Sequence, residues 1–323
     1  MKKIFLVLIL AVVCFFVASY FIPVVRQKEI PVSNTLENIA STIFQPRNWI
    51  KWNPLVKEAW LKDSSTCKFQ QDSIKETATI IIPGKQIIIH RKSFLSYDME
   101  EIVNNEHFSS ILSIIPYMGN KETNSEHQPS IAYAQDTKLI FKIFPSIEKN
   151  LLTEKSIATL KSYLENATLF YGFPIVIKQN TDTLFLTSKQ TISQQEFFKK
   201  ISLVFDSLDN YARANKLTPG SRNIYYQSQS NSSFEILAGV NIDKIPQPNS
   251  PYAFMQMPTT QYHVVAHYEG PFSERMQVYK ALTKYINDYH MVRIGVSFEK
   301  YLSPLPVSDT SIIRMDLYYP LRY

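Results

Sequence analysis

The C-terminal half of the chain repeats one order of elements at a fixed spacing. Gly220 and Gly295 are separated by about 75 residues, and Tyr226 and Tyr301 are separated by the same interval, which indicates a duplicated module. Each copy has the pattern of a strand, an amphipathic helix and two further strands. Two such β-α-β-β modules side by side predict one antiparallel sheet with helices on one face and a cleft where the modules meet. We therefore expect an α+β domain over residues 168–323.

Local signals mark the elements of both copies, which cover about 180–245 and 258–323. In the first copy, Ser193 and Glu196 form a capping box that begins a helix. In the second copy, the break at Gly270-Pro271 precedes the corresponding helix. Strands are expected at 182–187, 223–226 and 233–240 in the first copy, and at 261–268, 298–301 and 312–319 in the second.

The second copy resembles a known family. Its segments Tyr262–Phe272, Phe298–Leu302 and Met315–Leu321 are similar in kind and order to the GyrI-like effector-binding domain. This family includes the drug-sensing halves of some transcription regulators. The resemblance implies a cleft that takes up small, often cationic and lipophilic molecules, with aromatic side chains around a buried acid. It assigns Glu299 to that acid, with Tyr301 beside it. No DNA-binding segment accompanies the domain, so no nucleic-acid partner is expected.

The residues themselves are compatible with a cation site. Positions two apart on a strand share a face, so Glu299 and Tyr301 are expected to point the same way. A carboxylate among aromatic rings attracts a cation by charge and by cation–π contact. The alternative is a surface glutamate paired with a neighbouring lysine. The predicted ligand-binding residues are Glu299, Tyr301, Tyr268, Tyr225, Tyr226 and Tyr318.

Residues 26–166 show a different pattern. Two isoleucine-rich strands flank Pro83-Gly84-Lys85, which predicts a hairpin, and Thr153 is the expected N-cap of a helix that ends near Leu164. The isoleucines do not alternate with polar residues, so both faces of these strands should be covered. A curved sheet that grips the helix around a cavity would do this, and so would plain two-sided burial without a cavity.

The order of elements in this region resembles the START/polyketide-cyclase (SRPBCC) superfamily. The resemblance rests on an apolar N-terminal segment, a strand, a short helix with Asn34 as its N-cap and Glu37 at N3, the motif Trp49-x-x-Trp52-x-Pro54 and the C-terminal helix. It implies a helix-grip α+β domain with a deep cavity for lipids or other hydrophobic molecules. Trp49 and Trp52 would then line a second pocket; the alternative is that they are packing residues in a filled core.

The N-terminus predicts a membrane anchor over residues 1–25. Lys2 and Lys3 precede an uncharged stretch from Ile4 to Val25, which is about long enough to cross a hydrocarbon core. The stretch is longer than the core of a signal peptide. The charges before it favour a cytoplasmic N-terminus. We expect a single-pass protein of the bacterial cytoplasmic (inner) membrane with an extracytoplasmic globular part.

Few sequence features point to other chemistry. Cys14 and Cys67 are too few for a disulfide framework or a thiolate metal site. His263 and His267 lie four apart on an expected strand, about 13 Å from one another, so they are not expected to chelate a metal. No metal and no cofactor is expected, and the net charge of +6 is scattered over the sequence.

These observations predict a membrane-anchored, non-catalytic binder of small hydrophobic or lipophilic cationic molecules. Two alternatives stay open. One is a hydrolase of small electrophilic compounds, with Glu299 as the general base. The other is a structural or protein-interaction role in which both pockets are closed by side chains.

Overall fold

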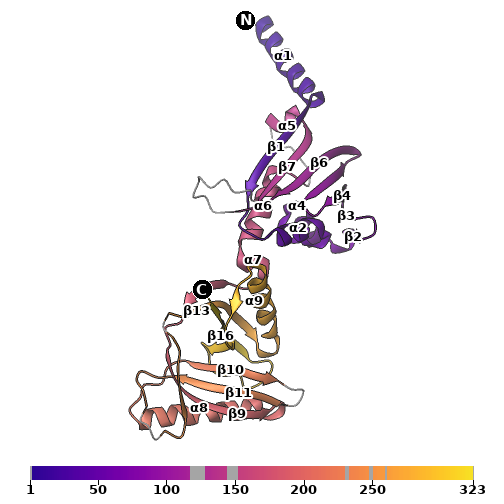
Figure 1. Cartoon of the computed structure of the whole chain (residues 1–323). Helices are drawn as coiled ribbons and strands as arrows, with labels where there is room; N and C mark the ends of the chain where they lie inside the picture. Colours follow the sequence, from indigo (N-terminus) through magenta and orange to yellow (C-terminus); the bar gives the residue numbers. More distant parts are fainter. Residues whose placement is uncertain are drawn as a thin grey trace. The chain divides into compact units, whose positions relative to one another are not determined.

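The computed structural model describes residues 2–116, 128–143, 152–229, 233–246, 250–258 and 260–322 (Figure 1). It divides into two compact units, Met1–Asn166 (unit 1) and Ala167–Tyr323 (unit 2), which are described separately. Each unit contains one antiparallel sheet and several helices, so the predicted α+β class is confirmed.

The described residues of unit 1 form a seven-stranded sheet in the order β1-β7-β6-β5-β4-β3-β2. Neighbours from β2 to β7 follow one another in the chain, and β1 completes the sheet at the edge of β7. The predicted hairpin joins β3 to β4, and Gly84 at its turn has a φ of +74°, which glycine adopts without strain. The strands are β1 (Pro23–Pro31), β2 (Lys68–Asp72), β3 (Thr77–Ile82), β4 (Lys85–Ser93), β5 (Ser96–Val103), β6 (Glu106–Ile115) and β7 (Ser130–Lys138).

The long helix of unit 1 begins as its sequence predicts. The Thr153 side chain accepts a hydrogen bond from the backbone of Ser156, and the Ser156 hydroxyl accepts one from the backbone of Thr153, which forms a capping box. Ile157, Leu160 and Leu164 are buried. The helices are α1 (Lys2–Phe21), α2 (Leu36–Phe44), η1 (Pro46–Asn48), α3 (Trp49–Trp52), α4 (Pro54–Lys62), η2 (Ser64–Thr66), α5 (Leu139–Ile143) and α6 (Glu154–Glu165).

Two local predictions for unit 1 are wrong. The N-cap of α2 is Thr35, because the Asn34 side chain instead donates to the Leu164 carbonyl at the end of α6. The isoleucine strands are not equally covered on both faces: Ile80 is buried, whereas Ile81 on the outer face is partly exposed. An apolar run in a strand therefore did not require a second covering layer here.

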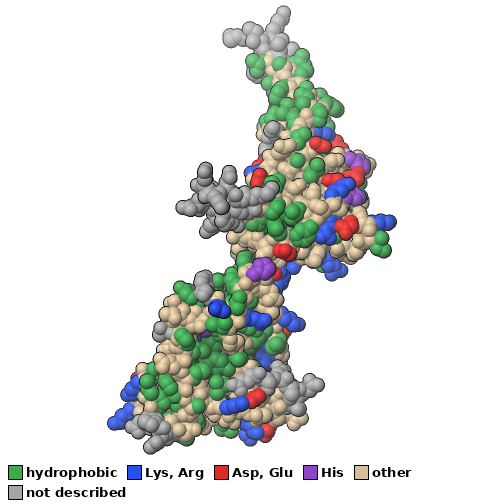
Figure 2. All heavy atoms as spheres, in the orientation of Figure 1, with side chains coloured by type: hydrophobic (Ala, Val, Ile, Leu, Met, Phe, Trp, Pro, Cys, Tyr) green, Lys and Arg blue, Asp and Glu red, His purple; other side chains and the backbone are tan. Residues whose placement is uncertain are grey.

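The membrane anchor predicted over residues 1–25 is not supported. Within the part of the chain that the structure describes, no helix is long and apolar enough to span a bilayer. The apolar run is divided: α1 ends at Phe21, and the next residues enter β1, where Val24 pairs with Thr137. Figure 2 shows hydrophobic side chains on the surface of α1. Leu8 and Leu10 are among the exposed ones.

The described residues of unit 2 form one antiparallel sheet, as predicted, but it has nine strands where the two modules accounted for six. Its order is β12-β9-β11-β10-β15-β16-β13-β8, with β14 paired to β16. The two copies of the module meet where β10 pairs with β15. The strands are β8 (Ile175–Gln179), β9 (Leu184–Ser193), β10 (Arg222–Gln229), β11 (Ser233–Asn241), β12 (Ala253–Gln256), β13 (Tyr262–Pro271), β14 (Val292–Arg293), β15 (Phe298–Tyr301) and β16 (Ile312–Arg322).

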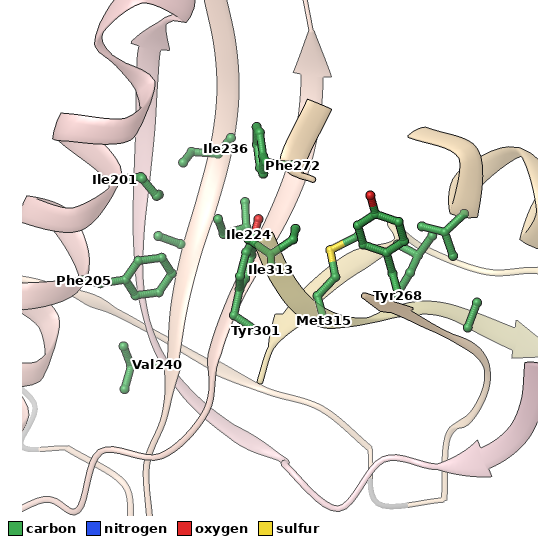
Figure 3. Close-up of a cluster of buried hydrophobic side chains, with 14 of the residues drawn as sticks. Ile201, Phe205, Ile224, Ile236, Val240, Tyr268, Phe272, Tyr301, Ile313 and Met315 are labelled. Carbon is green, nitrogen blue, oxygen red and sulfur yellow. The ribbon is translucent and has the colours of Figure 1, made fainter. Parts of the chain in front are cut away.

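The helices of unit 2 cover one face of this sheet, which we call the helix face. Side chains of α8 and α9 belong to the same hydrophobic core as the inward residues of the strands. Figure 3 shows Ile201 and Phe205 of α8 beside Ile236 and Val240 of β11. The helices are α7 (Ala167–Tyr171), η4 (Gln194–Glu196), α8 (Phe197–Ala214), η5 (Phe272–Glu274) and α9 (Met276–Asp288).

The chain itself crosses the opposite face of the sheet. β8 lies at one end of the strand order and β9 lies near the other, although they are consecutive in the chain. Residues 180–183, which connect β8 to β9, pass over the middle of the sheet. There Lys300 Nζ of β15 donates to Oδ2 of Asp182 at 2.6 Å. The backbone N–H of Met257 donates to the Thr183 carbonyl at 2.7 Å. We call this the connector face.

Candidate functional site

A fully buried carboxylate lies where the two modules of unit 2 meet. Glu299 of β15 is 0 % exposed and points to the helix face, between its register partners Ile224 on β10 and Leu317 on β16. Both neighbours belong to the hydrophobic core. An ionisable group in such surroundings is strongly disfavoured unless other groups supply hydrogen bonds and charge.

Four side chains donate hydrogen bonds to this carboxylate. Arg275 Nε and the Tyr279 hydroxyl reach Oε1 of Glu299 at 3.2 and 2.9 Å. The hydroxyls of Tyr301 and Tyr226 reach Oε2 at 2.6 and 3.4 Å. Each carboxylate oxygen therefore accepts two hydrogen bonds, and one donor is a cation. We call these five residues, together with Phe272, the Glu299 cage.

Arg275 provides the positive charge of the cage. It lies where η5 passes into α9, and its guanidinium carbon is 3.7 Å from the centre of the Phe272 ring and 5.7 Å from that of Tyr226. Its Nη1 also donates to the Phe272 carbonyl at 3.3 Å. A planar, delocalised cation is thus held against an aromatic face and beside a carboxylate.

The protonation states of the cage follow from burial. Burial raises the pKa of Tyr226, Tyr279 and Tyr301, and the nearby Glu299 raises it further. These phenols therefore stay protonated and act as donors at neutral pH. Burial lowers the pKa of Arg275, but the acidic groups of Tyr226 and Glu299 outweigh this effect and raise it above its usual value.

The structure brings together only part of the predicted ligand-binding set. Glu299, Tyr301 and Tyr226 are in contact, as described above. Tyr268 shares their face but lies two strands away, with Met315 between it and Tyr301 (Figure 3). The Tyr268 hydroxyl donates to the Pro271 carbonyl at 2.6 Å and closes its own turn.

Tyr225 and Tyr318 lie on the connector face. The prediction that they lie beside Glu299 is therefore wrong. They flank Phe298, with ring centroids 4.8 and 4.7 Å from it, and the Phe298–Tyr318 pair is stacked at 7°. Tyr225 and Tyr226 are adjacent on one strand, and adjacent strand residues point to opposite faces. The two tyrosines therefore could not both contact Glu299.

Sequence reasoning missed three members of the cage. Arg275 and Tyr279 are four residues apart at the start of α9, a spacing that places both on one side of a helix. Leu282 and Ile286 continue this side of the helix and are buried, and an apolar stripe at helical spacing is typical of a buried face. An arginine at the start of a buried stripe was the available signal for an internal partner of Glu299. Phe272, the third, is the aromatic residue after Gly270-Pro271 in the segment that resembles the GyrI-like domain, but no pattern placed it beside Glu299.

We expect His263, on the connector face, to make the free energy of unfolding of unit 2 depend on pH. It is 1 % exposed, its Nδ1 lies 3.1 Å from the Gln261 carbonyl, and burial lowers its pKa below the usual 6.5. Below pH 6.5 the unfolded chain therefore binds more protons than the folded one, and unit 2 should lose stability as the pH falls from there through the folded-state pKa.

We expect the His263→Phe variant to lose less stability than the wild type between pH 7.5 and 5.5. Phenylalanine keeps the edge-on ring contacts with Phe298 and Tyr318 but has no proton to gain. Urea unfolding followed by far-UV circular dichroism measures the difference. His290→Asn is the control, because His290 is exposed and its positive φ suits asparagine. An equal loss in wild type and His263→Phe would contradict this role of His263.

The residues described hold no evident metal site. None of their His, Cys, Asp and Glu side chains gather in groups of three or more that could hold an ion. His263 and His267 are both on β13, and the latter instead pairs with Asp316 at 2.9 Å.

Trp49 and Trp52, the predicted lining of a second pocket, lie in the core of unit 1. Their ring centroids are 4.5 Å apart, and the two side chains are 0 and 2 % exposed. Trp49 Nε1 donates to the Ile43 carbonyl at 2.9 Å. A hollow of about 250 Å³ beside α2 is lined by other residues, among them Phe44 and Arg91. The structure thus shows both tryptophans as packing residues.

No protein-family model and no curated protein matches the chain. Among solved structures, EcmrR in a DNA complex has a TM-score of 0.40 at 11 % identity, covering 57 % of this chain and 75 % of that one. The EcmrR C-terminal domain has a TM-score of 0.39 at 13 % identity, covering 46 % and 98 %. The di-domain ARO/CYC BexL has a TM-score of 0.31 at 9 % identity, covering 93 % and 85 %.

Similarity at this level assigns neither a family nor a function. We therefore infer the function from the geometry of the Glu299 cage.

Proposed function

We propose that unit 2 is a binding module for small lipophilic cations and that the Glu299 cage is its site. One observation carries the proposal: the cage already accommodates a delocalised cation, Arg275, between a carboxylate and an aromatic ring, with little access to water. A lipophilic cation needs the same environment, because it combines a charge with an apolar body that water solvates poorly.

The charges of the cage favour a cation over an anion. Glu299 is its acidic group, and the three tyrosines are protonated donors that orient the carboxylate without neutralising it. If the Arg275 side chain moved away, a buried acid among aromatic rings would remain. A cationic ligand would then restore the missing counter-charge, whereas an anion would be repelled.

The geometry does not favour the hydrolase alternative. A general base needs an oxygen lone pair that can reach the substrate or a water molecule. Both oxygens of Glu299 already accept two hydrogen bonds each. The competing interpretation is structural, with the ion pair only holding β15 against the start of α9. The inner-membrane location predicted from residues 1–25 stays a prediction.

Binding of tetraphenylphosphonium to the full chain tests the proposal. We expect saturable binding by isothermal titration calorimetry, and a loss of at least tenfold in affinity for Glu299→Gln, which removes the counter-charge but keeps the shape. Glu269→Gln is the matched control, because Glu269 is exposed on β13 of the same unit. Neutral triphenylphosphine oxide should bind at least tenfold more weakly than the cation.

Two results would count against the cation site. Equal affinity of wild type and Glu299→Gln would place any binding elsewhere. Absence of binding by the wild type, with the chain folded, would favour the structural interpretation.

A further inference from the structure

The Arg275 side chain occupies the place that a bound cation would need. Its Nε donates a hydrogen bond to Glu299 Oε1, and its guanidinium lies over the Phe272 ring. These are the charge contact and the aromatic contact of the cage. An incoming cation cannot make both of them while Arg275 is in place.

Arg275 is placed so that its side chain can leave while the rest of the cage stays. The Arg275 side chain is 10 % exposed and that of Glu299 is 0 % exposed, so the arginine is the more accessible partner of the pair. Its backbone N–H donates to the Phe272 carbonyl, a contact that rotation of the side chain does not break. Tyr226, Tyr279 and Tyr301 come from other positions and would keep their hydrogen bonds to the carboxylate.

We propose that Arg275 is an internal competitor: its guanidinium fills the Glu299 cage until a planar, delocalised cation, such as an aryl amidine or guanidine, displaces it. This inference rests on the proposed function and adds to it the class of ligand and the control of its affinity. Amidines and guanidines carry in-plane N–H groups that donate to a carboxylate and a flat face that stacks on an aromatic ring. They can therefore replace the contacts that Arg275 makes with the carboxylate and with the aromatic ring.

An internal competitor lowers the apparent affinity in a predictable way. If the side chain is withdrawn in only a fraction of molecules, the apparent dissociation constant is the intrinsic one divided by that fraction. A cage that is open in about 1 % of molecules would bind about a hundredfold more weakly than an open cage. Removal of the guanidinium should therefore tighten binding.

The test compares benzamidine binding to wild type and Arg275→Met in the full chain, by isothermal titration calorimetry. Methionine keeps an apolar chain of similar length without the charge. We expect Arg275→Met to bind benzamidine at least tenfold more tightly than wild type. Arg293→Met is the matched control, because Arg293 lies over the Tyr319 ring in the same unit and is exposed. It should bind as the wild type does.

The other outcomes of this test separate the internal competitor from the cation site. Equal or weaker benzamidine binding by Arg275→Met, with wild type still binding, overturns the competitor but leaves the cation site standing. Absence of benzamidine and tetraphenylphosphonium binding by both proteins overturns the two proposals together. If Arg275→Met does not fold, Arg275→Lys decides, because lysine keeps the charge and lacks the planar fork. At least threefold tighter binding by Arg275→Lys supports the competitor, and unchanged or weaker binding overturns it.

Discussion

Replacing Glu299 by methionine is expected to lower the free energy of unfolding of unit 2 by about 3–5 kcal/mol, because it leaves the buried charge of Arg275 without a partner. Three phenol hydroxyls would lose their acceptor as well. Urea unfolding of the full chain, followed by far-UV circular dichroism, measures the loss. The chain has 3 tryptophans, Trp49, Trp52 and Trp60, and all are in unit 1. Tryptophan fluorescence therefore reports on unit 1, whose transition should not move.

The double variant Glu299→Met/Arg275→Met is the control for this result. Removing both partners of a buried ion pair together costs far less than removing one, since no uncompensated charge stays in the core. We expect the double variant to recover most of the stability that the single variant loses. A loss below about 1 kcal/mol in Glu299→Met would show that Arg275 reaches water easily, and that the pair contributes as little as a surface salt bridge.

The same ion pair shows how far the sequence could define the site. The two-residue period of a strand placed Glu299 and Tyr301 on one side, and the structure confirms this contact. Arg275, which donates to the other oxygen of the carboxylate, lies at the start of α9, a helix that packs against the sheet. That packing is a tertiary property. A single arginine such as Arg275 at the start of an amphipathic pattern is equally consistent with a solvent-exposed residue and with a buried partner of an acid.

The elements of unit 2 were predictable where local signals are strong. Helices α8 and α9 and the central strands carry continuous apolar periodicity, and their order follows from the duplication. The strands β8, β12 and β14 were not predicted. Their residues are mostly exposed, so they carry little hydrophobic pattern, and they exist because neighbouring strands offer hydrogen bonds at or near an edge.

In unit 1, Trp49→Ala is expected to lower the free energy of unfolding by about 3–5 kcal/mol, as large-to-small changes of buried tryptophans do. Trp49 is fully buried, its ring is tilted against that of Trp52, and its Nε1 donates to the Ile43 carbonyl. Alanine would leave a cavity and an unpaired carbonyl at the end of α2. The loss can be followed by the fluorescence of Trp52 and Trp60 during urea unfolding.

Trp52→Phe makes the comparison that separates packing from ligand binding. Trp52 is as buried as Trp49, but its Nε1 donates to no atom of the described residues, and a buried donor without a partner is itself unfavourable. Phenylalanine removes that donor and part of the ring, so we expect a loss below about 1.5 kcal/mol. If the pair instead lined a pocket, Trp49→Ala would cost little stability, because the ring it removes would not be packed against the core.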